Sequence, residues 1–306
     1  MQRFEYALRA TIALVWVLLP TPAWTQEAAP VGAAQPYPRA ELLVEPQVVR
    51  TGRRDLVILD VRSEADYQRG HVPGAVRVDH DAWKGAFQEG NDAQGWSQRI
   101  GGLGIGPQTQ VIVYDDAMSK DAARIWWMLR YWGVEKAALI HGGWRGWQAS
   151  GRTIETKSAA PRAEKFEAVP RRQTLTLTDA LRKQVGNPGA APQIVDARSE
   201  AEFCGKDTRS ARRSGAMPGA KHLEWSNLID RKTHRFKPTA DLKKLFADAG
   251  IDPTKRTVTH CQSGGRSSVM AFGLELMRAG DVSNYYAGWA EWGNSDDTPI
   301  VKPPAR

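Results

Sequence analysis

Cys261 and the residues around it form the stretch of this sequence that is best suited to chemistry. The segment HCQSGGRSS, residues 260–268, holds one of the two cysteines in the chain. It follows a short apolar run and precedes a helical pattern that starts near Ser267. If Val258–His260 end a buried parallel strand, Cys261 lies at the carboxyl edge of a sheet, where open α/β sheets bind their ligands.

The turn after Cys261 predicts an anion-binding loop. Gly264 and Gly265 permit positive φ angles and close backbone approach, so the N–H groups of residues 262–266 can point inward. The N-terminus of the following helix adds partial positive charge at the same place. Together these features would lower the pKa of Cys261 below the ~8.5 of a free thiol. The sequence therefore predicts Cys261 as a nucleophilic thiolate.

Other roles for this cysteine stay open at the level of sequence. A buried structural cysteine would not need two glycines and an arginine after it. A structural metal site needs four ligands at close spacing, and only His260 is near, so no metal is expected. A disulfide with Cys204 would block the thiolate, and an oxidising compartment would permit it. Cys204 itself fits a small, partly buried residue better than a resolving thiol.

An internal repeat indicates that the elements around this site are duplicated. The chain has 306 residues, more than one core usually needs. Blocks of the first part recur in the same order in the second part, which indicates domain duplication rather than a solenoid. The matched blocks are 56–76 with 193–205 and 214–221, 111–115 with 257–261, and 141–147 with 286–292.

Each copy alternates short apolar runs with helical patterns. Runs such as Leu56–Leu59 and Val111–Tyr114 come before helical patterns such as those of residues 122–132 and 267–279. This order predicts an α/β fold in each copy, with a parallel sheet, helices on both faces and right-handed crossovers.

The two copies differ at the position of the cysteine. Asp115 occupies the place of Cys261, and Lys120 falls where Arg266 falls. The carboxylate of Asp115 cannot accept a sulfur atom as the thiolate of Cys261 could. We therefore expect the first copy to be catalytically silent. A basic segment, KDTRSARR at 206–213, is present only in the second copy. It would either guide anionic ligands to Cys261 or form a solvated charged loop.

The N-terminus has the pattern of a secretory signal peptide. Arg3 and Arg9 precede the apolar stretch Thr11–Leu19, which is followed by prolines and small residues to about Ala29. A buried core helix and an uncleaved anchor are the alternatives. With a signal peptide we expect a periplasmic or secreted protein that has no membrane segment after cleavage.

Composition shifts divide the chain into five predicted segments. They are a signal peptide at 1–29, a spacer at 30–38, a first domain at 39–156, a linker at 157–172 and a second domain at 173–300. The formal net charge is +8, but the basic residues are scattered and lack the clustered arm or stripe that nucleic-acid binding needs. The charge instead favours small anions as partners.

The motifs together resemble those of the tandem-domain rhodaneses, or thiosulfate sulfurtransferases. The likeness covers about residues 40 to 300 and rests on DVRSEADYQRGHVPGA, DARSEAEF, HCQSGGRSS and AGWAEW. It implies a five-stranded parallel sheet in each domain, an inactive first copy and an active site in the second. The second copy departs from the family at Ala216, where many members have a histidine; the first copy keeps His71.

The resemblance implies a reaction and assigns the site residues. Cys261 is the catalytic nucleophile, which takes sulfur from thiosulfate as a persulfide and passes it to cyanide, a small thiol or a thiol of an acceptor protein, without a cofactor. The resemblance also implies two arginines that bind the substrate, Arg266 at the end of the loop and Arg198. The remaining substrate-binding residues are those of the loop itself: Gln262, Ser263, Gly264 and Gly265.

The loop sequence favours thiosulfate among the related reactions. Four residues separate Cys261 from Arg266, one fewer than in cysteine phosphatases, so a phosphatase is the weaker interpretation. Relatives that use 3-mercaptopyruvate usually have Cys-Gly-Ser/Thr-Gly-Val-Thr, whereas a guanidinium at the loop end suits sulfonate oxygens. A 3-mercaptopyruvate sulfurtransferase and a non-catalytic persulfide carrier or anion-binding protein are the alternatives. Trp289 and Trp292 would form a docking face in such a carrier and core packing otherwise.

Overall fold

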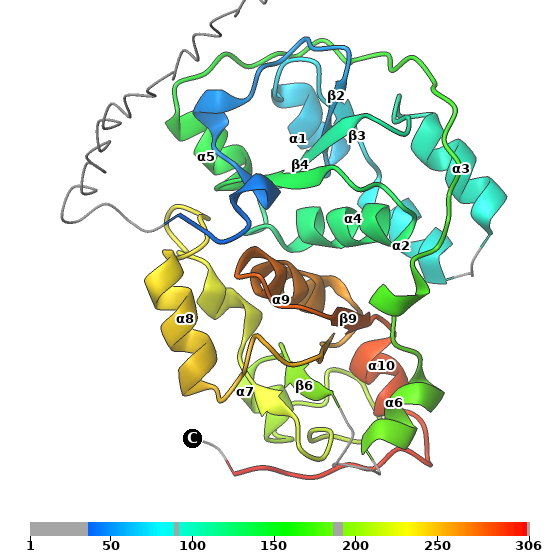
Figure 1. Ribbon diagram of the computed structural model, residues 1–306, viewed down its shortest axis with the longest axis vertical. Helices are drawn as coiled ribbons and strands as arrows, with labels where there is room; N and C mark the ends of the chain where they lie inside the picture. The colour runs from blue at the N-terminus through cyan, green and yellow to red at the C-terminus, as the bar shows by residue number, and fades with distance from the viewer. Residues whose placement is uncertain (1–35, 89–91, 186–191, 305–306) are drawn as a thin grey trace, which may run out of the picture. The chain divides into compact units, whose positions relative to one another are not determined.

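The computed structural model describes residues 36–88, 92–185 and 192–304 (Figure 1). The predicted signal peptide, residues 1–29, and most of the spacer lie outside these residues, so export stays a prediction. None of the helices in this described part of the chain has the length and apolar character that a membrane span requires.

A five-stranded parallel sheet forms the centre of the first half. Its strand order is β1-β5-β4-β2-β3, and every pairing is parallel. The strands are β1 (Leu43–Val44), β2 (Leu56–Asp60), β3 (Val76–Arg77), β4 (Gln110–Tyr114) and β5 (Ala137–Ile140).

A parallel sheet of four strands forms the centre of the second half. The strand order is β7-β6-β8-β9. The strands are β6 (Gln193–Asp196), β7 (Lys221–His222), β8 (Thr257–His260) and β9 (Val282–Tyr285). The predicted α/β fold with two parallel sheets is therefore confirmed.

The expected fifth strand of the second sheet is reduced to one residue in the described chain. Leu175 makes a single parallel bridge to Asn284 of β9, at the edge that β1 occupies in the first sheet. The 3-10 helix η3 (Arg172–Thr174) ends just before Leu175, and α6 (Thr178–Val185) begins soon after it. The backbone N–H of Thr176 adds one hydrogen bond to the carbonyl of Asn284 at 3.0 Å.

Helices connect the strands in both halves, as the alternating pattern predicted. Those described in the first half are α1 (Glu64–Arg69), α2 (His80–Gln88), α3 (Ala93–Gly101), α4 (Lys120–Tyr131) and α5 (Gly143–Ala149), with the 3-10 helices η1 (Ala40–Leu42) and η2 (Pro46–Val48). Those of the second half, besides η3 and α6, are α7 (Glu200–Phe203), η4 (Trp225–Leu228), α8 (Thr239–Asp248), α9 (Gly265–Leu276) and α10 (Gly288–Trp292).

Each sheet buries apolar side chains on both faces, which is why its strands read as nearly continuous apolar runs. In the first sheet, Ile58 packs in the cluster that contains Trp144 and Trp147 of α5, and the next residue, Leu59, packs in the cluster that contains α4. In the second sheet, Trp289 and Trp292 of α10 pack in the same way and are fully buried. They are core residues, so the alternative of an exposed aromatic docking face is wrong.

One hydrophobic core extends from the first half into the second. Helices α4 and α9 lie side by side where the two sheets face each other (Figure 1). Trp126 of α4 and Phe272 of α9 meet edge to face, with ring centroids 4.9 Å apart, and both side chains are fully buried. This contact fixes the first half against the helix that follows Cys261.

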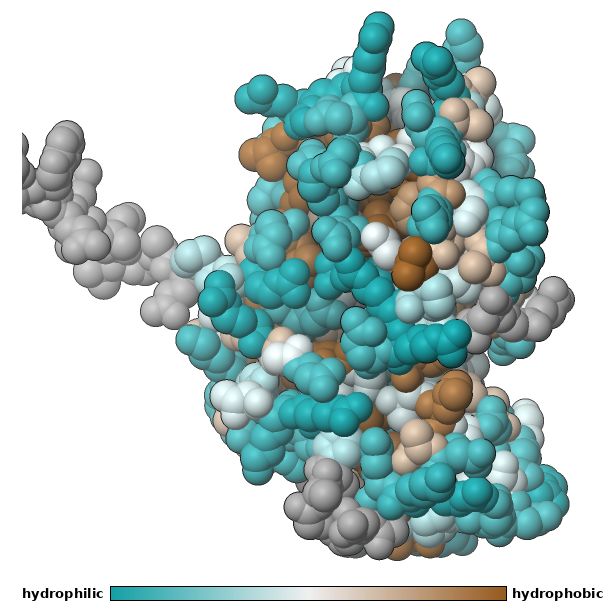
Figure 2. Space-filling view, turned by 45° about the vertical axis from the view of Figure 1, so that its right-hand side comes forward, coloured by the Kyte–Doolittle hydropathy of each residue, from teal (hydrophilic) through white to brown (hydrophobic). Residues whose placement is uncertain are grey.

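The face of the molecule in Figure 2 is mostly hydrophilic. Hydrophobic residues appear on it in small separate areas. The described large hydrophobic side chains that are exposed are likewise scattered along the chain: Val48, Ile154, Val169, Leu177 and Val301.

Candidate active site

Cys261 lies directly after β8, at the carboxyl edge of the second sheet, where the sequence placed it. It lines a pocket together with its own loop, the basic segment 206–213 and the first two turns of α4. The thiol side chain is almost completely buried. The lining residues are Lys120, Arg124, Arg209, Ser210, Cys261, Gln262, Ser263, Gly265 and Arg266.

The loop after Cys261 points its amides inward because its carbonyls are held elsewhere. The carbonyl of Cys261 accepts from the backbone N–H of Trp289 at 2.7 Å, and that of Gln262 accepts from Ala290 at 2.9 Å. The carbonyl of Gly264 accepts from the side chains of Ser267 and Ser268 at 3.0 and 2.8 Å.

The amide N–H groups of this loop are free by contrast. Those of Gln262, Ser263, Gly264 and Gly265 have no acceptor among the described residues. Gly264 has a φ of +86°, and a Cβ atom there would overlap the ring of Tyr286. Only glycine fits this position, and the free amides around it form the anion-binding nest that the sequence predicted.

Asp115 shows what such a loop binds. In the first half the carboxylate of Asp115 occupies the equivalent loop and accepts four backbone hydrogen bonds. Oδ1 accepts from Ala117 and Ser119 at 3.0 and 2.9 Å, and Oδ2 accepts from Asp121 and Ala122 at 2.9 Å each. Burial raises the pKa of Asp115 to about 6, although these N–H groups act to lower it. The first loop therefore carries its own anion, whereas the second has a thiol and free amides.

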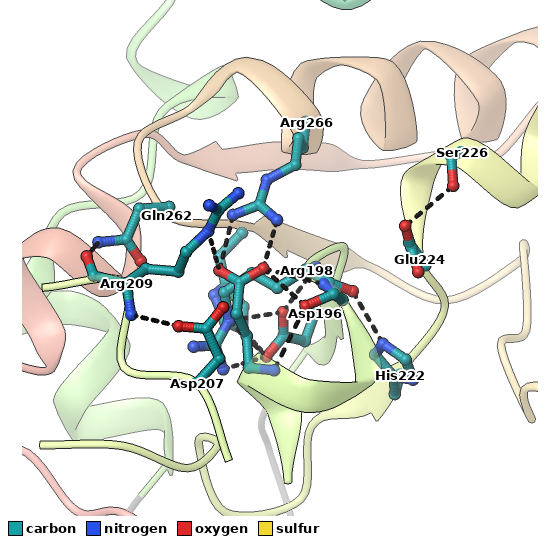
Figure 3. Close-up of polar contacts among 12 residues, drawn as sticks. Asp196, Arg198, Asp207, Arg209, His222, Glu224, Ser226, Gln262 and Arg266 are labelled. Atoms are coloured by element: carbon teal, nitrogen blue, oxygen red, sulfur yellow. Dashed lines mark hydrogen bonds and ion pairs between the residues drawn. The ribbon is translucent and has the colours of Figure 1, made fainter. Parts of the chain in front are cut away.

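Arg266 closes the loop and is paired with Glu202 of α7. Its Nη1 and Nη2 lie 2.6 and 2.8 Å from the two carboxylate oxygens in a bidentate ion pair (Figure 3). Burial would lower the pKa of Arg266, but Glu202 raises it above its ordinary value. Burial would raise the pKa of Glu202, and Arg266 holds it below its ordinary range. Part of the Arg266 charge is thus neutralised by the protein itself.

The structure does not bring Arg198 to the pocket, which corrects its expected role as a donor-binding residue. Arg198 is 1% exposed and binds Asp196 through Nε and Nη2 at 3.0 and 2.6 Å (Figure 3). Its Nη2 also donates to the carbonyl of Gly215 at 2.7 Å, and its guanidinium lies 4.1 Å from the ring centroid of Trp289.

The first half, which has Asp115 in place of the cysteine, repeats this arrangement, which identifies it as structural. There Arg62 binds Asp60, donates to the carbonyl of Gly70 and lies 4.0 Å from the ring centroid of Trp144. A donor-binding role would not require the same contacts in a copy without a cysteine.

Two residues of the basic segment 206–213 reach the pocket, Arg209 and Ser210. Arg209 lines it with a side chain that is 58% exposed, and Gln262 donates to the Arg209 carbonyl at 3.4 Å (Figure 3). Arg212 and Arg213 instead bind the segment after α10, for example through Asp296 and Thr298. The segment is therefore anchored at one end and presents Arg209 at the pocket.

Both cysteines are free thiols in the structure, so the alternative disulfide is not formed. Cys204 follows α7, and its Sγ lies 3.5 Å from the carbonyl of Pro304. His260, next to Cys261, is fully buried, and burial lowers its pKa to about 4. In the part of the chain that the structure describes, no group of three or more His, Cys, Asp or Glu residues could hold a metal ion.

Comparison with known proteins agrees with this geometry. The profile described as Rhodanese-like domain matches residues 47–150 and 177–295. The chain belongs to the rhodanese family.

Relatives within the rhodanese family resemble most of the chain. The thiosulfate sulfurtransferase of Pseudomonas aeruginosa is 29% identical over 268 residues, which cover 85% of this chain and 96% of that protein. The 3-mercaptopyruvate sulfurtransferase of Escherichia coli is 30% identical over 242 residues, covering 77% and 84%. A crystal structure of the anaerobic ergothioneine biosynthesis enzyme from Chlorobium limicola shares the fold, with a TM-score of 0.77 and 22% identity over 87% of this chain and 71% of that one.

The sequence did not indicate two residues of this rhodanese site, Glu202 and Arg124. Glu202 carries only a weak signal, the Ser199-to-Glu202 capping box at the start of α7, which says nothing about Arg266. Arg124 donates from Nη1 to the carbonyl of Ser263 at 2.7 Å and to the hydroxyl of Tyr286 at 2.5 Å. No sequence pattern links residues this far apart.

Proposed function

We propose that this chain is a thiosulfate sulfurtransferase that works through a persulfide on Cys261. The observation that carries the proposal is the contrast between the two loops. In the first, four amides bind the Asp115 carboxylate; in the second, the corresponding loop holds a thiol and free amides. Such a loop stabilises negative charge at the position of Cys261 Sγ and at an atom bound to it.

In the first step of the proposed reaction, the Cys261 thiolate attacks the outer sulfur of thiosulfate. A new S–S bond forms between the enzyme and that sulfur, while the S–S bond of the donor breaks. The electron pair of the broken bond leaves with sulfite. The loop amides stabilise the charge on the terminal sulfur of the persulfide.

In the second step an acceptor nucleophile attacks the terminal sulfur. With cyanide, a C–S bond forms, the enzyme S–S bond breaks, and its electron pair returns to Cys261 as thiolate, so thiocyanate leaves. A small thiol or a thiol of an acceptor protein would take the sulfur in the same way. Each step is a nucleophilic displacement that moves one sulfur atom and needs no external oxidant or reductant, so the proposed reaction uses no cofactor.

The charge of the pocket supports thiosulfate as the donor. Four cationic side chains line the pocket, and no carboxylate does: Lys120, Arg124, Arg209 and Arg266. Thiosulfate is a dianion, whereas 3-mercaptopyruvate carries one carboxylate and a thiol. The second donor remains the runner-up, because a 3-mercaptopyruvate sulfurtransferase is among the relatives of similar identity.

Thiocyanate formation from thiosulfate and cyanide tests this proposal. We expect turnover by the full chain and a loss of roughly 10³-fold or more in Cys261→Ser, since the nucleophile is removed. Cys204→Ser is the matched control and should keep the rate of the unmodified protein. Turnover with 3-mercaptopyruvate alone would support the runner-up donor. A stable persulfide without turnover would support a carrier, and no sulfur adduct at all would overturn the proposal.

A further inference from the structure

We infer that the silent first half supplies two cations, Lys120 and Arg124, to the donor pocket of Cys261 and thereby makes it selective for doubly charged donors. The inference rests on the proposed function, since it assumes an anionic sulfur donor in this pocket. It gives the first half a role in substrate choice although that half has no nucleophile.

Arg124 of α4 is built into the catalytic loop of the other half. It is 6% exposed, and its Nη1 donates to the carbonyl of Ser263 at 2.7 Å and to Tyr286 at 2.5 Å. The first of these bonds holds the Ser263 carbonyl and so helps to leave the loop amides facing Cys261. Arg124 is therefore a positioning residue as well as a charge.

Part of the Arg124 guanidinium is left without a partner at the pocket. Its Nε is buried and has no hydrogen-bond partner, and its Nη2 binds no described residue. The guanidinium lies so close to the loop that a Cβ atom at Gly265 would overlap Nη2. The glycine at 265 thus makes room for a cation from the other half, whose remaining N–H groups can receive an anion.

Lys120 lies one helical turn before Arg124 and therefore on the same face of α4. Its side chain is 40% exposed, and its ion pair with Asp121, at 3.6 Å, is long. Lys120 lines the same pocket as Cys261. The sequence matched it to Arg266 as the end of the silent loop, but the structure directs it to the active one.

Asp115 fixes the helix that carries both cations. Its carboxylate accepts from the amides of Asp121 and Ala122 in the first turn of α4. Farther along α4, Trp126 packs on Phe272 of α9. The helix is thus held at its start by an internal anion and along its length by the core.

The charge balance of the pocket explains why these cations decide the donor. Glu202 pairs with Arg266, so the loop-end cation brings less than its full charge. Glu202 also lies 3.9 Å from Nε of Arg209, so the second negative charge of a dianion must be met mainly by Lys120 and Arg124. A donor with one negative charge depends less on them, because Arg266 and the loop amides suffice.

The test compares Lys120→Gln, Lys120→Arg and Arg124→Gln with the control Lys136→Gln, which removes one charge from the same half. Lys136 is exposed, binds Gln108 and does not line the pocket. Lys120→Gln should raise the KM for thiosulfate about tenfold, the size of a charged hydrogen bond, with kcat little changed. Lys120→Arg should restore the KM for thiosulfate of the unmodified protein. The KM for 3-mercaptopyruvate should change less than about threefold in the two Lys120 variants and in Lys136→Gln.

Arg124→Gln should lower kcat and raise KM for thiosulfate together, because the loop also loses a support. Its melting temperature shows whether the fold persists, and Lys120→Gln keeps the inference testable if it does not. Calorimetric binding of thiosulfate to Cys261→Ser, with and without Lys120→Gln, measures binding without turnover.

The outcomes separate the two proposals. If the unmodified chain turns over thiosulfate but Lys120→Gln changes both donors equally or neither, the inference is overturned and the proposed function stands. If no donor is turned over, the proposed function fails, and weaker thiosulfate binding in the Lys120→Gln variant of Cys261→Ser still supports the cation site. Equal thiosulfate binding by Cys261→Ser with and without Lys120→Gln overturns the inference about the cation site.

Discussion

At the scale of single residues, the two halves differ in which anion the same loop holds. Asp115 brings its own carboxylate to the amides, and Cys261 brings a sulfur that can take up another atom. The ion pair of Arg198 with Asp196, by contrast, has the same form as that of Arg62 with Asp60 in the first half. It only supports the backbone. What decides chemistry is therefore one side chain on a repeated scaffold.

His260 gives a prediction about pH at this scale. Burial lowers its pKa to about 4, from an ordinary 6.5, so the folded state favours the neutral ring. The stability from this preference is fully present above pH 6.5 and is lost as the pH falls through 4. As the pH falls over that range, we expect the free energy of unfolding of the unmodified chain to decrease by about 3 kcal/mol relative to that of His260→Gln. Urea unfolding of both proteins at pH 7.5 and 4.5 measures this difference. A constant difference would show that the pKa of the ring is not lowered in the folded protein.

At the scale of elements, the strand, loop and helix around Cys261 form one structural unit that positions the thiol. β8 brings the thiol to the sheet edge, the loop turns its amides inward, and α9 starts at Gly265. The tightest point is Gly264, where the backbone is left-handed and the ring of Tyr286 covers the Cα atom.

Gly264→Ala should therefore destabilise the chain. The positive φ costs about 1 to 2 kcal/mol and the overlap with Tyr286 adds to it, so we expect a loss of about 3 kcal/mol and of most activity. Gly280→Ala is the control, because no atom lies near its Cβ position and its φ is not positive. It should change the free energy of unfolding by less than about 0.5 kcal/mol. Equal losses in the two variants, measured by denaturant unfolding, would contradict this account of the loop.

Much of this structural unit could be predicted from the sequence, because its signals are local. The apolar run before Cys261, the two glycines and the repeat against Asp115 together indicate the strand, the loop and the equivalent loop of the first half. Arg198 was misplaced because the family resemblance says nothing about how deeply it is buried. Arg124 could not be found at all, since its contact with Ser263 spans 139 residues and depends on how α4 packs on α9. The fifth strand of the second sheet is reduced to the single bridge of Leu175 to Asn284, a non-local pairing that no local sequence signal marks.

At the scale of the whole molecule, the two halves share one core and one pocket. The contact between Trp126 and Phe272 joins α4, which carries the two cations, to α9, which follows Cys261. The start of the described chain also crosses over, since Tyr37 donates to the carbonyl of Phe236 at 3.1 Å and Arg39 pairs with Glu275 at 2.9 Å. The halves should therefore unfold together.

Phe272→Ala tests this coupling. Truncating a fully buried phenylalanine should cost about 3 to 5 kcal/mol, and the loss should lower a single transition for both halves. Leu177→Ala, at a side chain that is 64% exposed, is the control and should cost less than about 0.5 kcal/mol. Calorimetry together with tryptophan fluorescence follows the transitions. Two separate transitions, of which only one moves, would show that the halves are independent.

The most direct test of the central claim is the intact mass of the reduced protein after thiosulfate is added and removed. The account predicts a gain of one sulfur atom, located on Cys261 by peptide mapping, retained in Cys204→Ser and lost when cyanide is added. An unchanged mass, or a sulfur that maps to Cys204, would contradict it.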